Sequence, residues 1–355
     1  MKNICFIYTD ITTTGGIERC ISLIANKLAN SGEYNVNIIS IKRDGGTPFF
    51  SFDDKINISY LYNKEEKRKK MKTIKRIREF LKKNKIETII VANVALEILI
   101  TPAILGMKIK HISWEHFGFS DEMSNKYIDI ARRISVKLSD YVVVLTQHDK
   151  NEYLHKYRIG KKTQLKQIYN PIVQNDYERD FKENKKILTI GHFLPVKGYD
   201  FLIEIAKEIF VKYPEWSWTI IGDGENKKEF ENKIIEYKLE NKITIKSKIK
   251  DVNRYYESAD IYVNTSRSEG FALTILEART YELPVVAFNI PGMDEIVENN
   301  VNGILVEKFN VSKMIEALEK IIIDKDLRKK YSINAKNNLE MLDIDNIIKK
   351  WKKII

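Results

Sequence analysis

Residues 267–277 read RSEGFALTILE and place two glutamates, Glu269 and Glu277, eight positions apart around the expected start of a helix. The apolar run at residues 261–264 stands just before them and predicts a strand, so the segment is a strand, a loop and a helix. Carboxylates accept hydrogen bonds from sugar hydroxyls, and the unpaired N–H groups at a helix start favour a phosphate. Those N–H groups belong to Gly270, Phe271, Ala272 and Leu273. The stretch therefore has the parts of a nucleotide-sugar cradle, and an ordinary loop-to-helix junction is the alternative.

Apolar strand-like runs alternate with helix-period segments along the chain, the pattern of parallel sheets covered by helices. Strands are expected at residues 3–8, 36–41, 56–61, 88–92, 111–114 and 141–145, and then at 186–191, 218–222, 243–246, 261–264, 285–287 and 303–306. The alternation breaks near Pro171, which favours an extended connection. We therefore expect two α/β domains, residues 1–169 and 170–344. The amphipathic tail at 345–355 needs an apolar surface for Trp351.

Length and composition limit the class of protein. With 355 residues, 43% of them hydrophobic, the chain can form two domains with a core each. Two cysteines, Cys5 and Cys20, give no disulfide framework and favour a reducing compartment, the cytoplasm. The first ten residues predict a buried strand and not a secretory signal. The apolar stretch 88–107 contains polar residues and a proline, so a strand, a loop and a helix start are expected there in place of a membrane span.

The net charge of +11 suggests an anionic partner or an anionic surface as a hypothesis. No zinc-finger spacing, aromatic strand motif or recognition helix is found, so nucleic acid is not expected as a partner. Much of the charge lies in residues 64–85, where twelve Lys or Arg stand against three Glu. No helix presents two histidines at ligand spacing, so no metal site is expected.

Three other strand ends carry candidate ligand-binding residues. Gly16 heads a helix that should run to about Asn30, where the missing side chain lets a ligand approach the backbone. His192 and Lys197 follow the first strand of the second domain and could supply charge to a phosphate. His116 follows the strand at 111–114. A tight turn, a solvated lysine and a packed histidine are the structural alternatives.

The order and spacing of these pieces resemble the retaining nucleotide-sugar glycosyltransferases of family 4, which have the two-Rossmann-domain architecture called GT-B. The likeness is carried by residues 15–16, 170–171, 191–198, 222–224, 269–277, 291–292 and 302–303. It implies two Rossmann-like domains whose parallel sheets face each other across a cleft. The C-terminal helix at 345–355 would return to the N-terminal domain.

The resemblance also implies roles in the C-terminal domain, which would hold a nucleoside-diphosphate sugar. Glu269 would contact the donor-sugar hydroxyls, Glu277 the ribose and Lys197 the diphosphate. The backbone of residues 271–273 would approach sugar and phosphate. One departure is His192, which stands where the family has an arginine. A permanent cation is thereby replaced by a side chain type that titrates near neutrality.

In the N-terminal domain, the resemblance implies that Gly16 lies beside the donor phosphate and the acceptor, and that His116 lies near the transferred sugar. Glu269, His116 and Lys197 are then the candidate catalytic residues. The implied reaction is metal-independent transfer of a hexose or N-acetylhexosamine, most simply from UDP, with retention and without a cofactor. The acceptor would be a lipid-linked or soluble glycan in bacterial surface-polysaccharide assembly.

The expected location is the cytoplasm, with residues 64–85 binding an anionic membrane surface on the inner face. Two other functions remain open. A nucleotide-sugar epimerase could use the same fold without an acceptor. A non-catalytic subunit that binds sugar nucleotides or scaffolds a membrane complex would fit if the His192 site holds diphosphate poorly.

Overall fold

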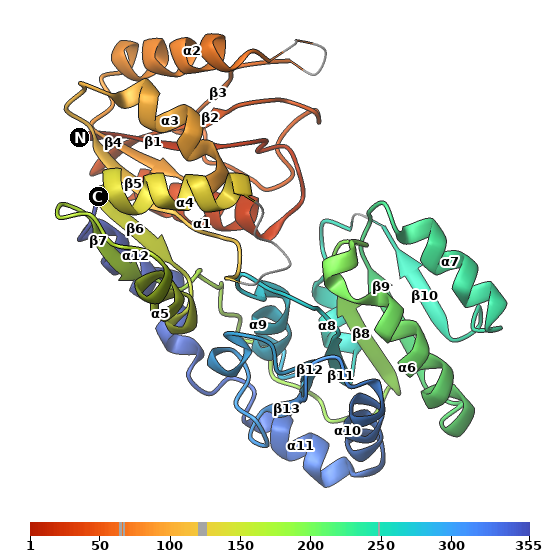
Figure 1. Cartoon of the computed structure of the whole chain (residues 1–355). Helices are drawn as coiled ribbons and strands as arrows, with labels where there is room; N and C mark the ends of the chain where they lie inside the picture. The colour runs from red at the N-terminus through yellow and green to blue at the C-terminus, as the bar shows by residue number, and fades with distance from the viewer. Residues whose placement is uncertain (64–65, 67, 120–125, 248) are drawn as a thin grey trace. The chain divides into compact units, whose positions relative to one another are not determined.

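The computed structural model describes residues 1–63, 66, 68–119, 126–247 and 249–355. It divides into two compact units (Figure 1). The first comprises residues 1–171 and 341–355, and the second comprises residues 172–340. Each unit is built on one parallel sheet.

The first unit has a seven-stranded sheet in its described residues, in the order β3-β2-β1-β4-β5-β6-β7. Its strands are β1 (Lys2–Tyr8), β2 (Tyr34–Ser40), β3 (Asn57–Tyr60), β4 (Thr88–Val91), β5 (Lys110–Trp114), β6 (Tyr141–Val144) and β7 (Gln164–Gln167). Its helices are α1 (Gly16–Asn30), α2 (Lys70–Lys83), η1 (Val94–Leu96), α3 (Glu97–Ile104), α4 (Lys126–Leu138), α5 (Gln147–Lys156), η4 (Leu339–Leu342, at the boundary between the units) and α12 (Ile344–Lys352).

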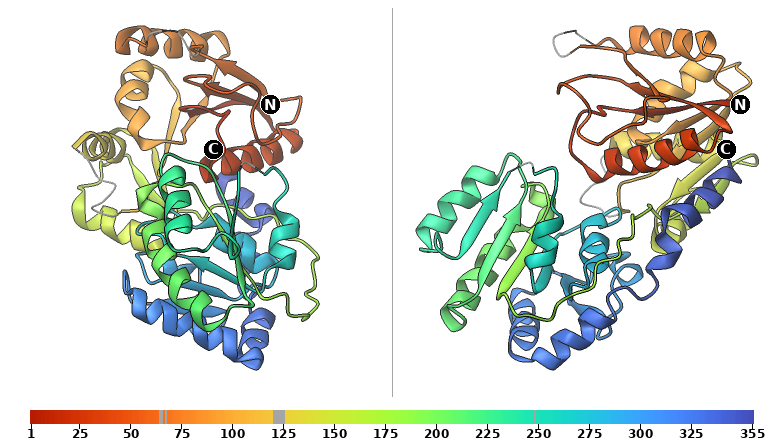
Figure 2. Two further views of the ribbon diagram at one scale, coloured as in Figure 1. Left: turned by 90° about the vertical axis from the view of Figure 1, so that its right-hand side faces the viewer. Right: turned by 180° about the vertical axis from the view of Figure 1, so that it is seen from behind.

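Continuous apolar runs in the central strands place the core of this unit. Phe6 of β1 pairs with Ile38 on one side and Ile90 on the other, and all three side chains are buried. Helices α2, α3 and α4 lie side by side on one face of the sheet, while α1 and α12 pack together on the other (Figures 1 and 2). The expected return of the C-terminal helix to the N-terminal domain is therefore confirmed.

The second unit has a six-stranded sheet in its described residues, in the order β10-β9-β8-β11-β12-β13. Its strands are β8 (Lys186–Ile190), β9 (Ser217–Ile221), β10 (Ile243–Lys246), β11 (Ile261–Asn264), β12 (Val285–Phe288) and β13 (Gly303–Val306). Its helices are η2 (Pro195–Lys197), α6 (Tyr199–Lys212), α7 (Lys227–Glu236), α8 (Asn253–Ser258), α9 (Leu273–Thr280), η3 (Met293–Glu295), α10 (Val311–Ile323) and α11 (Lys325–Ile333).

The expected strands all form, and β7 is an additional one. Its sequence, QLKQ, is largely polar because the strand lies at the edge of the sheet, and it therefore gives no apolar signal. The stretch 88–107 forms β4, η1 and α3, as expected. None of the helices in the described part of the chain is long and apolar enough to cross a membrane.

Candidate functional site

The strand order of the second unit creates a switch point between β8 and β11. From β8 the chain continues to β9 and β10 on one side, whereas β11 begins the run to β12 and β13 on the other. The loops that follow β8 and β11 therefore leave the same edge of the sheet in opposite directions, which is where open α/β sheets bind ligands.

These two loops are joined by backbone and side-chain contacts. The Arg267 amide donates to the Val196 carbonyl at 2.7 Å, and Thr265 Oγ1 donates to the Lys197 carbonyl at 3.1 Å. Gly198 has φ +66°, and a Cβ there would lie 2.1 Å from the Thr265 carbonyl oxygen. Only glycine allows this approach, so Gly198 fixes the position of Lys197 beside the β11 loop.

Lys197 and Glu269 form an ion pair across the two loops. Lys197 Nζ lies 2.8 Å from both carboxylate oxygens of Glu269. Ser266 Oγ donates to Glu269 Oε1 at 2.6 Å, and Asn264 Nδ2 does so at 3.4 Å. Burial alone would raise the pKa of Glu269, but the Lys197 ammonium and the surrounding hydrogen-bond donors hold it below its ordinary value. The carboxylate is therefore ionised and held in one orientation.

The N-terminus of α9 lies directly after this pair. Its N-cap residue is Ala272, whose side chain makes no capping hydrogen bond, and the positive end of the helix dipole favours an anion here. The Leu273 amide was expected to be a free donor, but it donates to the Phe271 carbonyl at 2.7 Å. The helix begins at Leu273 and not at Gly270, so Glu269 precedes it and only Glu277 lies within it.

Glu277 is half-buried in the second turn of α9. Its Oε2 accepts a hydrogen bond of 3.0 Å from the Tyr256 hydroxyl. Tyr256 comes from α8 and is buried, so it anchors the carboxylate from a neighbouring element. A hydroxyl pair such as that of a ribose needs an acceptor held in this way.

His192 lies half-buried just after β8, on the same loop as Lys197. Arg267, which could have supplied the cation that the family places there, is instead bound to Asp200 at 2.8 and 2.5 Å. It also lies over the Phe201 ring, 4.2 Å from the centroid. Its guanidinium is therefore held by Asp200 and by the Pro195 carbonyl.

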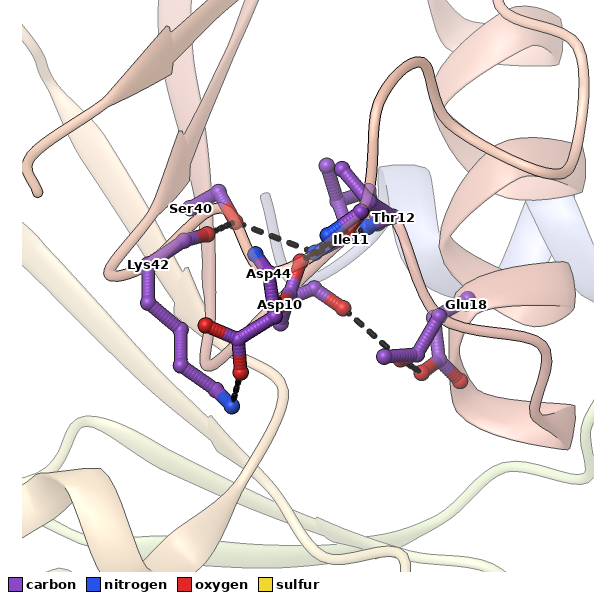
Figure 3. A network of polar contacts seen from close by, with 9 residues as sticks. Asp10, Ile11, Thr12, Glu18, Ser40, Lys42 and Asp44 are labelled. Atoms are coloured by element: carbon purple, nitrogen blue, oxygen red, sulfur yellow. Dashed lines mark hydrogen bonds and ion pairs between the residues drawn. The ribbon is translucent and has the colours of Figure 1, made fainter. Parts of the chain in front are cut away.

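In the first unit, Gly16 opens α1 as expected, and a polar network holds its loop (Figure 3). Asp10 Oδ1 accepts from the Thr12 amide at 2.9 Å and from its hydroxyl at 2.6 Å, and Asp10 Oδ2 accepts from the Asp44 amide at 2.9 Å. Glu18, in the first turn of α1, accepts from Thr13 Oγ1. The loop between β1 and α1 is thus tied both to the loop after β2 and to its own helix.

His116 is 7% exposed and packs on Trp114, with ring centroids 4.1 Å apart. Burial lowers the pKa of His116 to about 3, so the ring is neutral near pH 7. Its Nε2 is buried and has no hydrogen-bond partner among the described residues. A neutral imidazole with a free nitrogen can bind a hydroxyl, but it cannot supply positive charge.

The loop that carries His116 is fixed by its neighbour Glu115. Glu115 Oε2 accepts from Arg132 Nε at 2.7 Å and from the Tyr153 hydroxyl at 2.6 Å, while Oε1 accepts from the Phe117 amide at 3.0 Å. Glu115, Arg132 and Tyr153 are all at most 2% exposed. This buried network holds the backbone on both sides of the histidine.

Sequence reasoning missed several of these partners. Ser266 and Asn264 could have been found, because Asn264 ends a predicted strand at the switch point. Asp10 likewise follows a predicted strand. Arg132 gave no signal, since only the packing of α4 brings it to Glu115. The structure brings Lys197, Glu269 and the start of α9 together, while Gly16 and His116 lie in the other unit.

Comparisons with known proteins agree with this architecture. Residues 14–174 match the family model described as Glycosyltransferase Family 4, and residues 174–338 match Glycosyl transferases group 1. An uncharacterized glycosyltransferase of Haemophilus influenzae is 34% identical over the full length of both chains. The amylovoran biosynthesis glycosyltransferase AmsD of Erwinia amylovora is 27% identical, also over the full length of both.

Two further similarities are informative. An alpha-1,4-N-acetyl-D-galactosaminyltransferase of Campylobacter jejuni, whose name includes a glycan on PP-undecaprenol, is 26% identical over 100% of this chain and 98% of its own. Among solved structures, Staphylococcus aureus TarM in complex with UDP and alpha-GlcNAc-glycerol aligns with a TM-score of 0.83 and 16% identity, covering 100% of this chain and 99% of that one. The structural likeness confirms the expected GT-B fold.

Proposed function

The chain belongs to glycosyltransferase family 4, and from that premise we propose that it transfers a hexose or N-acetylhexosamine from a UDP-sugar, with retention, to a lipid-linked glycan. The observation that carries the proposal is the Lys197–Glu269 pair beside the N-terminus of α9, at the switch point of the second sheet. A cation, an oriented carboxylate and a helix dipole are the groups that a diphosphate sugar requires.

The chemistry follows from where charge develops. Breaking the bond between the anomeric carbon and the diphosphate builds positive charge on the sugar and negative charge on the leaving group. Lys197 and the α9 dipole lower the energy of that leaving diphosphate. Glu269 orients the sugar through its hydroxyls, and Glu277, anchored by Tyr256, holds the ribose. His116 contributes a neutral hydrogen bond near the transferred sugar.

For retention, we propose attack by the acceptor hydroxyl on the same face from which the diphosphate leaves. The acceptor oxygen forms a bond to the anomeric carbon as the bond to the phosphate oxygen breaks. The leaving phosphate oxygen receives the acceptor's proton, so the reaction needs neither a protein nucleophile nor a metal ion. UDP, the nucleotide that leaves when a UDP-sugar gives up its sugar, is present with TarM in its complex, which supports uracil as the nucleobase of the donor.

A lipid-linked acceptor is supported by the Campylobacter relative and by the basic surface of α2. The exposed cations there, called the α2 basic surface, are Arg68, Lys69, Lys70, Lys72, Lys75, Lys82, Lys83 and Lys85. Residues 64, 65 and 67 of the predicted membrane-binding segment lie outside the described residues. The apolar side of the helix is turned inward, with Ile77 and Leu81 fully buried. Each cation near an anionic leaflet contributes about 1 kcal/mol, which favours peripheral binding at the inner face of the membrane.

The proposal is tested by incubating the protein with a panel of nucleotide sugars and undecaprenyl-diphosphate glycans, with product mass as the readout. Transfer from a UDP-hexose or UDP-N-acetylhexosamine, with the α-linkage preserved in the NMR spectrum of the product, is the expected result. Conversion of the donor without an acceptor would show an epimerase. Binding of UDP-sugars with no turnover on any acceptor would show a non-catalytic subunit.

A further inference from the structure

Three aromatic rings connect the C-terminal helix to the candidate active-site histidine. The Trp351 ring of α12 meets the Trp114 ring of β5, with centroids 4.8 Å apart and planes at 69°. Trp114 in turn packs on His116, at 4.1 Å and 50°. Trp351 is 0% exposed and Trp114 1% exposed. The last helix of the chain therefore reaches His116 through a single intervening side chain.

The three rings differ in how their backbones are held. Trp114 ends β5, where it pairs with Val143 of β6. Trp351 lies on a helix that starts at an Asp343 cap and buries Ile347 and Ile348 as well. His116 lies beyond the end of β5, in a loop. Glu115 fixes the backbone of that loop through the Phe117 amide, while the imidazole itself packs on the Trp114 ring.

The ring nitrogens support this conclusion. Trp114 Nε1, Trp351 Nε1 and His116 Nε2 are all buried without a hydrogen-bond partner among the described residues. A buried polar atom without a partner costs free energy, and native structures keep few of them. With no hydrogen bond at these atoms, ring-to-ring contact is what defines the rotation of each ring. The contact with Trp114 is therefore the described interaction that sets the orientation of the His116 ring.

We propose that Trp351 is a positioning residue, which holds Trp114 and through it sets the orientation of the His116 imidazole toward the substrate. The inference rests on the proposed function for its kinetic consequence, but the ring contact itself is independent of activity. The last helix follows the second unit in the chain but belongs to the first. Through Trp351 it would then help to position the histidine that the first unit contributes to the reaction.

The test replaces Trp351 by Leu, which keeps apolar bulk and removes the ring. Ile347→Ala is the matched control, since Ile347 is fully buried on the same helix but lies outside the aromatic contacts. Trp351→Phe retains an aromatic ring. Imidazole signals are recorded by long-range ¹H–¹⁵N NMR; the chain has five histidines, so His116→Gln assigns the signal of interest.

Trp351→Leu should move the His116 ring signals and lower kcat about tenfold at saturating donor, with KM for the donor changed less than about twofold. Trp351→Phe should recover most of the loss, and Ile347→Ala should lower the melting temperature without the kcat effect. Unmoved His116 signals in Trp351→Leu, or a kcat loss no greater than that of Ile347→Ala, would overturn the proposal. If the wild type transfers no sugar, the proposed function fails, while the NMR result still decides the positioning.

Discussion

Lys197 Nζ lies 2.8 Å from both carboxylate oxygens of Glu269, although the two residues are 72 positions apart. The pair has one partner on each of the two loops that leave the switch point, so it joins the phosphate-binding and sugar-binding halves of the proposed donor site. Because the pair is partly buried, removing one partner leaves the other with an unmatched charge.

Replacing Lys197 by Ala should weaken UDP binding by about 1.5–3 kcal/mol, or tenfold or more, because the diphosphate loses a charged hydrogen-bond partner. Isothermal titration calorimetry with UDP measures the change. Lys207→Ala is the control, since Lys207 is exposed on the adjoining helix α6. If wild type and Lys197→Ala bound UDP with equal affinity, Lys197 would not be a diphosphate ligand.

Glu277→Ala should reduce affinity for UDP by about tenfold, because the ribose hydroxyls lose an anchored acceptor. Pyrophosphate carries no ribose, so its inhibition constant should stay the same in this variant. Tyr256→Phe removes the anchor but keeps the carboxylate, and its effect should be smaller. If Glu277→Ala affected UDP and pyrophosphate equally, Glu277 would act on the phosphates or on the fold.

Much of this site could be predicted from the sequence because its residues stand at the ends of strands. Apolar runs predicted β8 and β11, and parallel strands bring their carboxyl ends to one edge, so Lys197 and Glu269 were expected at the same place. The sequence could not predict their direct contact, which depends on Gly198 touching Thr265. Arg267 shows the same limit, since its pairing with Asp200 depends on packing between two loops.

The His116 region shows why long-range partners escape a sequence argument. The strand before it was predicted, but Arg132 and Trp351 reach it from helices that begin 10 and 228 residues beyond His116, α4 at Lys126 and α12 at Ile344. Neither the type of these two residues nor their spacing in the sequence predicts that they contact the His116 region. The low pKa of His116 is also a product of folding, since it is caused by burial.

The stability of the protein should fall in mild acid because of His116. Its pKa is about 3 in the folded protein and about 6.5 when unfolded, so below pH 6.5 the unfolded state binds a proton that the folded state excludes. This loss amounts to about 1.4 kcal/mol per pH unit, or about 2 kcal/mol at pH 5. Urea unfolding at pH 7.5 and pH 5 should show a smaller acid loss in His116→Gln than in the wild type. Parallel losses in the two proteins would mean that His116 is protonated or accessible when folded.

Turnover should survive chelation. The proposed mechanism uses Lys197 and the α9 dipole to stabilise the diphosphate, so EDTA should leave transfer within about twofold of its untreated rate. The measurement is product formation after treatment with EDTA and removal of the chelate. If activity were lost completely and manganese or magnesium restored it, the enzyme would require a metal ion and the metal-free mechanism would be wrong.

Membrane binding should depend on the α2 basic surface and on ionic strength. Co-sedimentation with vesicles containing phosphatidylglycerol should be strong at low salt and should fade as the screening length shrinks to about 8 Å at physiological strength. Replacing Arg68, Lys69, Lys70, Lys72 and Lys75 by Gln should release the protein from the vesicles. The fold should be retained, because these side chains are exposed while Ile77 and Leu81 hold α2 to the core.

The control for this variant has the same loss of charge elsewhere: Lys207, Lys228, Lys238, Lys320 and Lys330 replaced by Gln, all exposed in the second unit. It should sediment like the wild type if position, and not net charge, determines binding. On a lipid-linked acceptor in vesicles, the α2 variant should lose most of its turnover, while on a soluble analogue of the same glycan it should match the wild type. Equal loss on both acceptors would show that these cations act on catalysis or folding. If the α2 variant and the control were released from the vesicles equally, membrane binding would depend on the overall charge of +11 and not on the α2 basic surface.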